Sequence, residues 1–277
     1  MKTTVGEIEF GYDRGGTGEP VLLVMGLGTP RIGWFPQVMF LTQHYDVVSY
    51  DNRGVGETVC AVPWTLADMA NDAVGLADAI GFDRFHLVGI SMGGMISQEV
   101  VLSHPDRVRS LTLIATSPGG PEAELMTPAY AEALQEPDPK LRMRRATELT
   151  FGARFRREHP EMMELILSTL ESGVTGVDAI GGEMGAGFMG QVMAVATWMG
   201  MGGAAERLKD IAVPTLVMHG GDDLLIPITN GEILARDIAG ARSRFFPDGG
   251  HALNAEYPDD VNTELVRHFE GASARVV

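Results

Sequence analysis

Short, strongly apolar runs constrain the fold of this chain most, because a longer helical pattern separates one such run from the next. Val21–Met25 is apolar at every position, as expected for a strand that is buried on both faces of a sheet. Residues 65–80 instead carry apolar side chains at helical spacing, and Gly81 ends that pattern. Parallel strands need long crossover connections, which are usually helices. The alternation therefore predicts an α/β fold, with a mainly parallel sheet flanked by helices.

The same patterns place the remaining elements of the sheet and its helices. We expect strands at 45–50, 85–90, 108–115, 215–218 and 243–246, and helices at 92–103 and from Pro258 onward. Near the N-terminus, residues 6–13 alternate apolar and polar side chains and then meet the glycine-rich Arg14–Gly18. This arrangement predicts a hairpin at that point.

The segment 118–205 lies between the fourth and fifth predicted strands. It has helical character and far exceeds the ~10–15 residues of a simple crossover, so it predicts an inserted helical cap on a core formed by 1–117 and 206–277. Residues 173–203 within it are rich in glycine and methionine. This composition fits loosely packed helices with methionine as filler, and it equally fits a mobile lid over an apolar pocket. A lid would bring Met189 and Met193 to the substrate.

Gly89-Ile90-Ser91-Met92-Gly93 is a G-x-S-x-G pentapeptide between a predicted strand and a predicted helix. In that setting a sharp, strained turn lifts the serine hydroxyl above the sheet, and crowding leaves room only for small neighbours. The alternative is that Ser91 merely caps the helix that follows. The strand–turn–helix context favours a nucleophile.

Three further motifs follow the ends of predicted strands. Gly26-Leu27-Gly28 follows the first apolar run, and Asp51-Asn52-Arg53-Gly54-Val55-Gly56 follows the second strand. Two adjacent acids, Asp222 and Asp223, follow the fifth strand, and His251 follows a Gly-Gly turn after the last one. The serine, the acids and the histidine thus occur in the chain order Ser…Asp…His.

With these motifs in this order, the chain resembles the α/β-hydrolase superfamily over nearly its whole length, and especially its capped bacterial esterase-like members. The resemblance implies an α/β-hydrolase fold with an inserted helical cap. It also implies a catalytic triad of Ser91, Asp223 and His251, and an oxyanion hole formed by the backbone N–H groups of Leu27 and Met92.

The details of the resemblance decide between neighbouring residues. Relatives place the triad acid four residues before a proline, here Pro227, which selects Asp223 over Asp222. Their counterpart of the loop 51–56 is structural and supports the site. Many relatives carry histidine where this chain has Met25, a departure that affects a supporting side chain and no backbone donor.

The chemistry of acyl transfer explains why these three residue types occur together. A serine hydroxyl is a weak nucleophile until a base accepts its proton. Histidine suits this role with an unperturbed pKa of about 6.5, and a buried carboxylate fixes its tautomer and stabilises the imidazolium. His219 precedes the acid loop and is expected to support it, whereas Cys60 lacks the strand-to-helix turn of a nucleophile.

These residues lead to the hypothesis of a serine hydrolase that cleaves a carboxylic ester of an apolar small molecule through an acyl-enzyme. Lactonases, thioesterases, C–C bond hydrolases and perhydrolases use the same triad, so the motifs do not separate these activities. A non-hydrolytic lyase or cyclase and a binding protein on this fold also remain open. Serine at the turn argues against haloalkane dehalogenases and epoxide hydrolases, which resemble this fold but carry aspartate there.

The charge of the chain limits its expected partners. Its 37 acidic and 21 basic residues give a net charge of −16, which repels phosphates and anionic lipids, so we expect no nucleic-acid or membrane partner. No apolar run approaches the ~20 residues that span a bilayer, and acid stands near the N-terminus where a signal peptide would be apolar.

Cysteine and motif content complete the expectations. Cys60 is the single cysteine, so no internal disulfide is expected, and no metal-ligand spacing is found. We therefore expect a cytoplasmic protein without metal or cofactor that acts on a small ester-like molecule. The sequence leaves its oligomeric state open.

Overall fold

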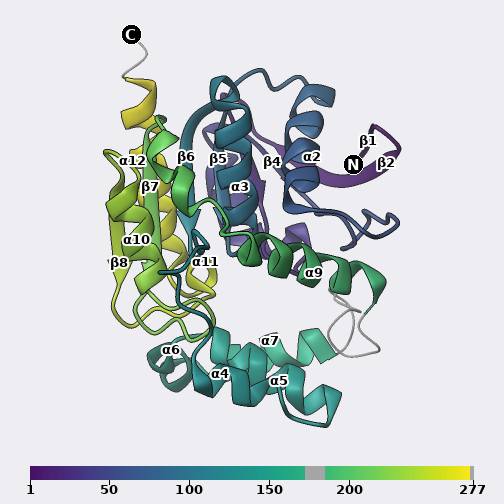
Figure 1. Cartoon of the computed structure of the whole chain (residues 1–277), viewed down its shortest axis with the longest axis vertical. Helices are drawn as coiled ribbons and strands as arrows, with labels where there is room; N and C mark the ends of the chain where they lie inside the picture. Colours follow the sequence, from purple (N-terminus) through teal and green to yellow (C-terminus); the bar gives the residue numbers. More distant parts are fainter. Residues whose placement is uncertain (172–184, 275–277) are drawn as a thin grey trace.

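The computed structural model describes residues 1–171 and 185–274 (Figure 1). This described part contains a sheet of eight strands in the order β1-β2-β4-β3-β5-β6-β7-β8. β1 pairs antiparallel with β2, β2 pairs antiparallel with β4, and every later pair is parallel. The strands are β1 (Lys2–Val5), β2 (Ile8–Gly15), β3 (Glu19–Val24), β4 (Tyr45–Tyr50), β5 (Phe85–Ile90), β6 (Val108–Ile114), β7 (Thr215–Gly220) and β8 (Arg242–Phe246).

Helices cover both faces of the sheet, which explains why its central strands are apolar throughout. Leu22 and Val24 of β3 belong to the core shared with α2, α3 and α10. Val21 and Leu23 belong to the core on the other face, shared with α1, α11 and α12. A parallel sheet between two helical layers confirms the predicted fold class. These helices are α1 (Phe35–Leu41), α2 (Leu66–Ala79), α3 (Met92–Ser103), α10 (Thr229–Asp237), α11 (Leu253–Glu256) and α12 (Pro258–Ser273).

The ends of α2 show how local sequence sets a helix boundary. Thr65 Oγ1 accepts the N–H of Asp68 at 3.1 Å, and the Asp68 carboxylate accepts the N–H of Thr65 at 2.8 Å. This reciprocal pair satisfies two N–H groups that have no partner inside the helix. Gly81 follows the helix with a φ of 81°, a conformation that glycine adopts without strain.

The predicted N-terminal hairpin forms, but at a different turn. Gly6, with a φ of 59°, and Glu7 join β1 to β2. Arg14–Gly18 instead leads from the end of β2 into β3, and β4 lies between these two strands in the sheet. The predicted position was wrong because turn residues do not indicate which strands they join.

The chain between β6 and β7 divides into two parts in space (Figure 1). Four helices pack together into a lobe at the bottom of Figure 1: α4 (Pro128–Ala133), α5 (Pro139–Thr150), α6 (Ala153–Glu158) and α7 (Pro160–Glu171). α9 (Ala186–Gly200) lies along the core instead, and Trp198 Nε1 donates to Glu99 of α3 at 2.7 Å. The predicted cap of 118–205 spans both parts. Residues 172–184 of its glycine- and methionine-rich stretch lie outside the described residues.

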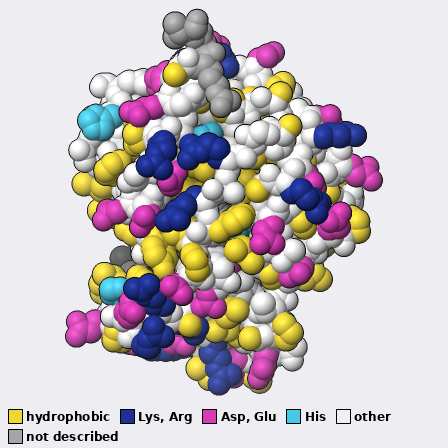
Figure 2. Space-filling model, turned by 90° about the vertical axis from the view of Figure 1, so that its left-hand side faces the viewer, with side chains coloured by type: hydrophobic (Ala, Val, Ile, Leu, Met, Phe, Trp, Pro, Cys, Tyr) yellow, Lys and Arg dark blue, Asp and Glu magenta, His cyan; other side chains and the backbone are white. Residues whose placement is uncertain are grey.

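The acidic excess of the chain is not spread evenly. Figure 2 shows Lys and Arg side chains gathered over the lower lobe, with acidic side chains beside them. Several of these bases pair with acids, as Arg154 does with Glu158 at 3.0 Å and with Asp248 at 3.2 Å. The lobe therefore has a mixed-charge surface. Its bases between residues 139 and 158 are Lys140, Arg142, Arg144, Arg145, Arg154, Arg156 and Arg157.

Candidate active site

Ser91 occupies a sharp turn between β5 and α3. Its backbone has a φ of 55° and a ψ of −125°, a region that residues other than glycine rarely adopt. Neighbouring segments hold this conformation: Ile114 O accepts the N–H of Ser91 at 2.9 Å, and Thr116 Oγ1 donates to Ser91 O at 2.7 Å. This is the strained geometry expected of a nucleophile turn.

Contact distances explain the small residues around Ser91. A Cβ added to Gly89 would lie 2.2 Å from Gly93 O, and one added to Gly93 would lie 2.1 Å from Val24 O. Both neighbours are backbone atoms, which cannot yield as the end of a flexible side chain can. The turn therefore forms only with glycine at both positions.

Asp223 and His251 follow β7 and β8 and meet as a buried pair. His251 Nδ1 lies 2.8 Å from Asp223 Oδ2. The other carboxylate oxygen, Oδ1, accepts the N–H groups of Leu225 at 3.0 Å and Ile226 at 2.8 Å. These two bonds fix the direction of the carboxylate. An ionised carboxylate only accepts, so Nδ1 carries the proton and Nε2 of His251 is left as a base.

A second histidine, His219, also contacts Asp223. His219 Nε2 lies 2.8 Å from Ile226 O and 3.4 Å from Asp223 Oδ2. A carbonyl oxygen only accepts, so this Nε2 carries a proton. Burial raises the pKa of Asp223, but the charge of His251 and the hydrogen bonds from both histidines outweigh it and hold the pKa at about 2. Asp223 is therefore ionised at neutral pH, and His219 supports the acid loop.

The neighbouring acid Asp222 has a different partner. Its Oδ2 accepts the N–H of Ala153 at 2.6 Å, at the start of α6. Its own N–H donates to Gly249 O at 2.8 Å. Asp222 thus links the lobe to the core, while Asp223 contacts His251.

The segment 26–28 passes directly beside Ser91. A Cβ added to Gly26 would lie 3.1 Å from Ser91 Cβ and 3.6 Å from its Oγ. On the other side of the serine, Met92 is the first residue of α3, where an N–H has no acceptor within the helix. The two predicted oxyanion donors, Leu27 and Met92, therefore belong to the segments that border Ser91.

The loop that follows β4 supports this segment, as expected. Asp51 is fully buried and accepts the N–H of Arg31 at 2.8 Å, in addition to pairing with its guanidinium. Asn52 Nδ2 donates to Met25 O at 2.8 Å. These bonds fix both ends of the segment from Met25 to Arg31, which contains the predicted oxyanion loop.

The family of the chain follows from comparison with known sequences. The family model described as alpha/beta hydrolase fold matches residues 19–258. The chain belongs to the α/β-hydrolase family. Its eight-stranded sheet and the serine turn after β5 agree with that membership.

Individual relatives of this α/β hydrolase support a hydrolytic activity. RutD of Caulobacter vibrioides, which carries the name of a carbamate hydrolase, is 30% identical over 272 residues, covering 92% of this chain and 91% of RutD. The enol-lactonase from Burkholderia xenovorans LB400 matches with a TM-score of 0.80 at 26% identity, covering 98% of this chain and 100% of that one. A thermophilic esterase from Thermogutta terrifontis gives a TM-score of 0.78 at 26% identity, covering 98% of both chains.

Helix α9 holds the two methionines that the sequence assigned to substrate contact. Met189 is 37% exposed and Met193, one turn further along the same side, is 59% exposed. Two other residues of α9 contact the oxyanion loop and were not predicted: Phe188 packs against Gly28, and Gln191 accepts its N–H. No sequence signal marked them, because their partner lies far away along the chain.

Glu256 was also not predicted, and it joins the lobe to the loop of His251. Its Oε1 accepts the N–H of Gly250 at 3.0 Å and the N–H of Gly152 at 3.2 Å. Burial raises the pKa of Glu256 to about 7, against the two N–H donors and with the charges of Asp222 and Asp223 adding to the increase. This carboxyl group therefore titrates near neutral pH next to the predicted base.

Replacing Glu256 with glutamine should change how stability depends on pH. The folded-state pKa of about 7 lies above the ordinary value of 4.5, so its contribution to stability is fully present below pH 4.5 and is lost as the pH rises through 7. The amide keeps an acceptor for both N–H groups but does not ionise. The variant should gain stability over wild type between pH 5 and pH 8, by at most about 3 kcal/mol. Denaturant unfolding at several pH values measures this gain, and parallel pH curves would contradict it.

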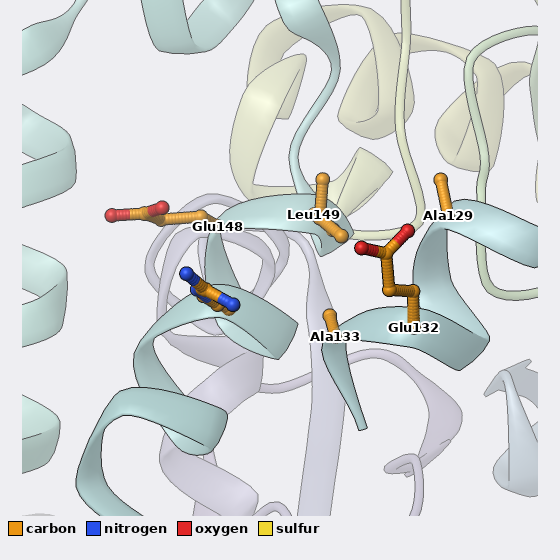
Figure 3. Close-up of a pocket in the computed structure, with 6 residues that line it drawn as sticks. Ala129, Glu132, Ala133, Glu148 and Leu149 are labelled. Carbon is orange, nitrogen blue, oxygen red and sulfur yellow. The ribbon is translucent and has the colours of Figure 1, made fainter. Parts of the chain in front are cut away.

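The largest cavity described lies within the lobe, away from the predicted triad (Figure 3). It has a volume of about 190 Å³ between α4 and α5. In Figure 3 the Glu132 carboxylate turns toward Leu149, whereas Glu148 points away to the other side. The cavity contains no residue of the predicted site. Its lining residues are Ala129, Glu132, Ala133, Arg145, Glu148 and Leu149.

Metal and membrane features were also sought in the described residues. Within 1–171 and 185–274, no group of three or more His, Cys, Asp or Glu side chains is arranged to hold a metal ion. No helix in the same ranges is long and apolar enough to cross a bilayer.

Proposed function

We propose that this α/β hydrolase is a carboxylic ester hydrolase that acts on an apolar small molecule through an acyl-enzyme. The observation that carries the proposal is the 2.8 Å pair of His251 and Asp223, formed after two strands that run parallel to β5. The carboxyl ends of parallel strands meet at one edge of a sheet, where Ser91 also stands in its strained turn.

The first half-reaction transfers the acyl group to the enzyme. Ser91 Oγ attacks the acyl carbon, and its proton passes to His251 Nε2. The N–H groups of Leu27 and Met92 stabilise the oxyanion, an effect worth roughly 3–4 kcal/mol for one such donor. The ester C–O bond then breaks, and His251 gives the proton to the leaving alcohol. Asp223 stays ionised and stabilises the imidazolium.

The second half-reaction releases the acid by the same groups. His251 takes a proton from water, and the water oxygen bonds to the acyl carbon. The bond to Ser91 Oγ breaks, and the proton returns from His251 to the serine. One oxygen of the product acid therefore comes from solvent.

The relatives define the acyl substrates that deserve testing first. Their names give an enol-lactonase, an esterase and a carbamate hydrolase. A lactone is a cyclic ester, so the same steps would open its ring. The similarity to the enol-lactonase therefore makes lactone hydrolysis the second candidate.

The experiment is a panel of p-nitrophenyl esters of graded chain length, lactones and carbamates, run in oxygen-18 water. Hydrolysis should place one solvent oxygen in each acid product. Turnover without that label would indicate a lyase or cyclase. A wild-type protein that turns over no acyl substrate would indicate a binding protein.

Truncation of the α9 methionines should change chain-length preference. Met189→Ala and Met193→Ala should each shift kcat/KM between short and long esters, by about 1–3 kcal/mol if the methionine packs against the ester chain. Hydrolysis of a small activated acetate should change little, because the reacting groups are untouched. Met201→Ala, at an 82% exposed residue beyond α9, provides a matched control. Equal loss for every ester in a folded variant would contradict the assignment.

A further inference from the structure

Gln191 connects α9 to two loops of the core through both ends of its side-chain amide. It is fully buried in the described structure. Its Oε1 accepts the N–H of Gly28 at 2.7 Å, and its Nε2 donates to Arg53 O at 2.7 Å. The first partner belongs to the predicted oxyanion loop, and the second to the loop that supports it. Each bond joins residues separated by more than a hundred positions in the chain.

Close backbone packing surrounds these two bonds. Gly28 has a φ of 68°, and a Cβ there would lie 2.8 Å from the ring of Phe188. A Cβ on Gly187 would lie 2.2 Å from Gly54 O. The first turn of α9 is therefore pressed against both loops, and Gln191 stands where they meet.

We propose that Gln191 is a positioning residue that holds the oxyanion loop in its working geometry from the inserted segment. The proposal rests on the proposed function, in which Leu27 supplies an oxyanion donor. Gln191 engages the N–H of Gly28, the residue that follows Leu27, and so it fixes the peptide next to that donor. It does not touch the substrate.

The physical reason is the short range of oxyanion stabilisation. A donor acts when it lies about 2.7–3.1 Å from the developing charge, and the loss of one such donor costs about 10²–10³ in kcat. A loop released at Gly28 displaces the neighbouring N–H without removing it. The loss should therefore be smaller, about 10–100-fold, and should appear in kcat because the charge develops only in the transition state.

The test compares Gln191→Met with Trp198→Phe. The first substitution keeps the length of the side chain but removes both bonds to the core loops. The second removes a bond of the same length, from α9 to Glu99, at the other end of the helix. With p-nitrophenyl acetate, Gln191→Met should lose about 10–100-fold in kcat at little-changed KM, and Trp198→Phe should stay within about twofold.

Gln191→Glu supplies a second arm that keeps the shape of the site. Its carboxyl group is nearly isosteric with the amide, and when protonated it accepts from Gly28 and donates to Arg53 O. Ionisation replaces that donor with a second acceptor facing Arg53 O. Relative to wild type at each pH, kcat should be near normal at acidic pH and fall as the carboxyl group ionises.

A measurement that needs no activity keeps the inference separate from the proposed function. The amide hydrogen of Gly28 should exchange at least about tenfold faster in Gln191→Met than in wild type, and at the wild-type rate in Trp198→Phe. Unchanged exchange in Gln191→Met, or equal kcat losses in both variants, would overturn the positioning role. If Ser91→Ala retained full activity, the proposed function would fail, and the exchange rates would still decide whether Gln191 holds the loop.

Discussion

Ser91→Ala should abolish ester turnover while the fold stays intact. The serine hydroxyl is the only group of the proposed site that bonds to the acyl carbon, and loss of a triad member typically removes about 10⁴–10⁶-fold of rate. Alanine replaces a hydroxyl that is not needed to close the turn, because the backbone N–H and O of residue 91 make the bonds to Ile114 and Thr116. The expected result is a folded protein with only residual turnover.

A fluorophosphonate probe gives the sharper measurement for this variant. The probe should label the wild-type protein on Ser91 and should leave Ser91→Ala unlabelled. Denaturant unfolding of the two proteins controls for misfolding. Persistent labelling of the variant would place the nucleophile elsewhere.

Asp223→Asn should lower kcat by about 10⁴-fold, while Asp222→Asn has a mild effect. The amide oxygen at 223 would stay with the N–H groups of Leu225 and Ile226, so the NH₂ group would face His251. A donor at that point forces His251 Nδ1 to accept, which moves the ring proton to Nε2. The imidazole then cannot take the proton of Ser91.

The neighbouring variant is the matched control for the acid loop. Asp222→Asn retains an oxygen that accepts the N–H of Ala153, so the loop should keep its attachment to α6. The two variants should be compared by kcat and by the pH profile of kcat/KM. A larger loss in Asp222→Asn than in Asp223→Asn would reverse the assignment of the acid.

Local pattern was sufficient for most of the sheet and its helices. The continuous apolar runs matched buried strands because each strand contributes to a core on both faces, as β3 does through Val21 and Leu22. Gly89 and Gly93 marked the serine turn because crowding there excludes a Cβ. The hairpin was misplaced because strand neighbours depend on sheet order, which turn residues at Arg14–Gly18 do not encode.

Partner choice at the site depended on contacts that local pattern does not contain. The spacing to Pro227 favoured Asp223, and the folded chain joins that acid to His251 while Asp222 binds Ala153. The attachment of Glu256 to Gly250 and Gly152 had no sequence signal at all.

The sequence by itself determined the fold class and the residue types of the candidate site, because strand burial and the crowded serine turn leave a periodic and local record. Only the tertiary structure decided that α9 lies on the core and that Gln191 bonds to Gly28 and Arg53 O. A buried amide bonds to whatever backbone group the folded chain brings within about 3 Å, and residues far apart in sequence meet only after the sheet and its helices have packed.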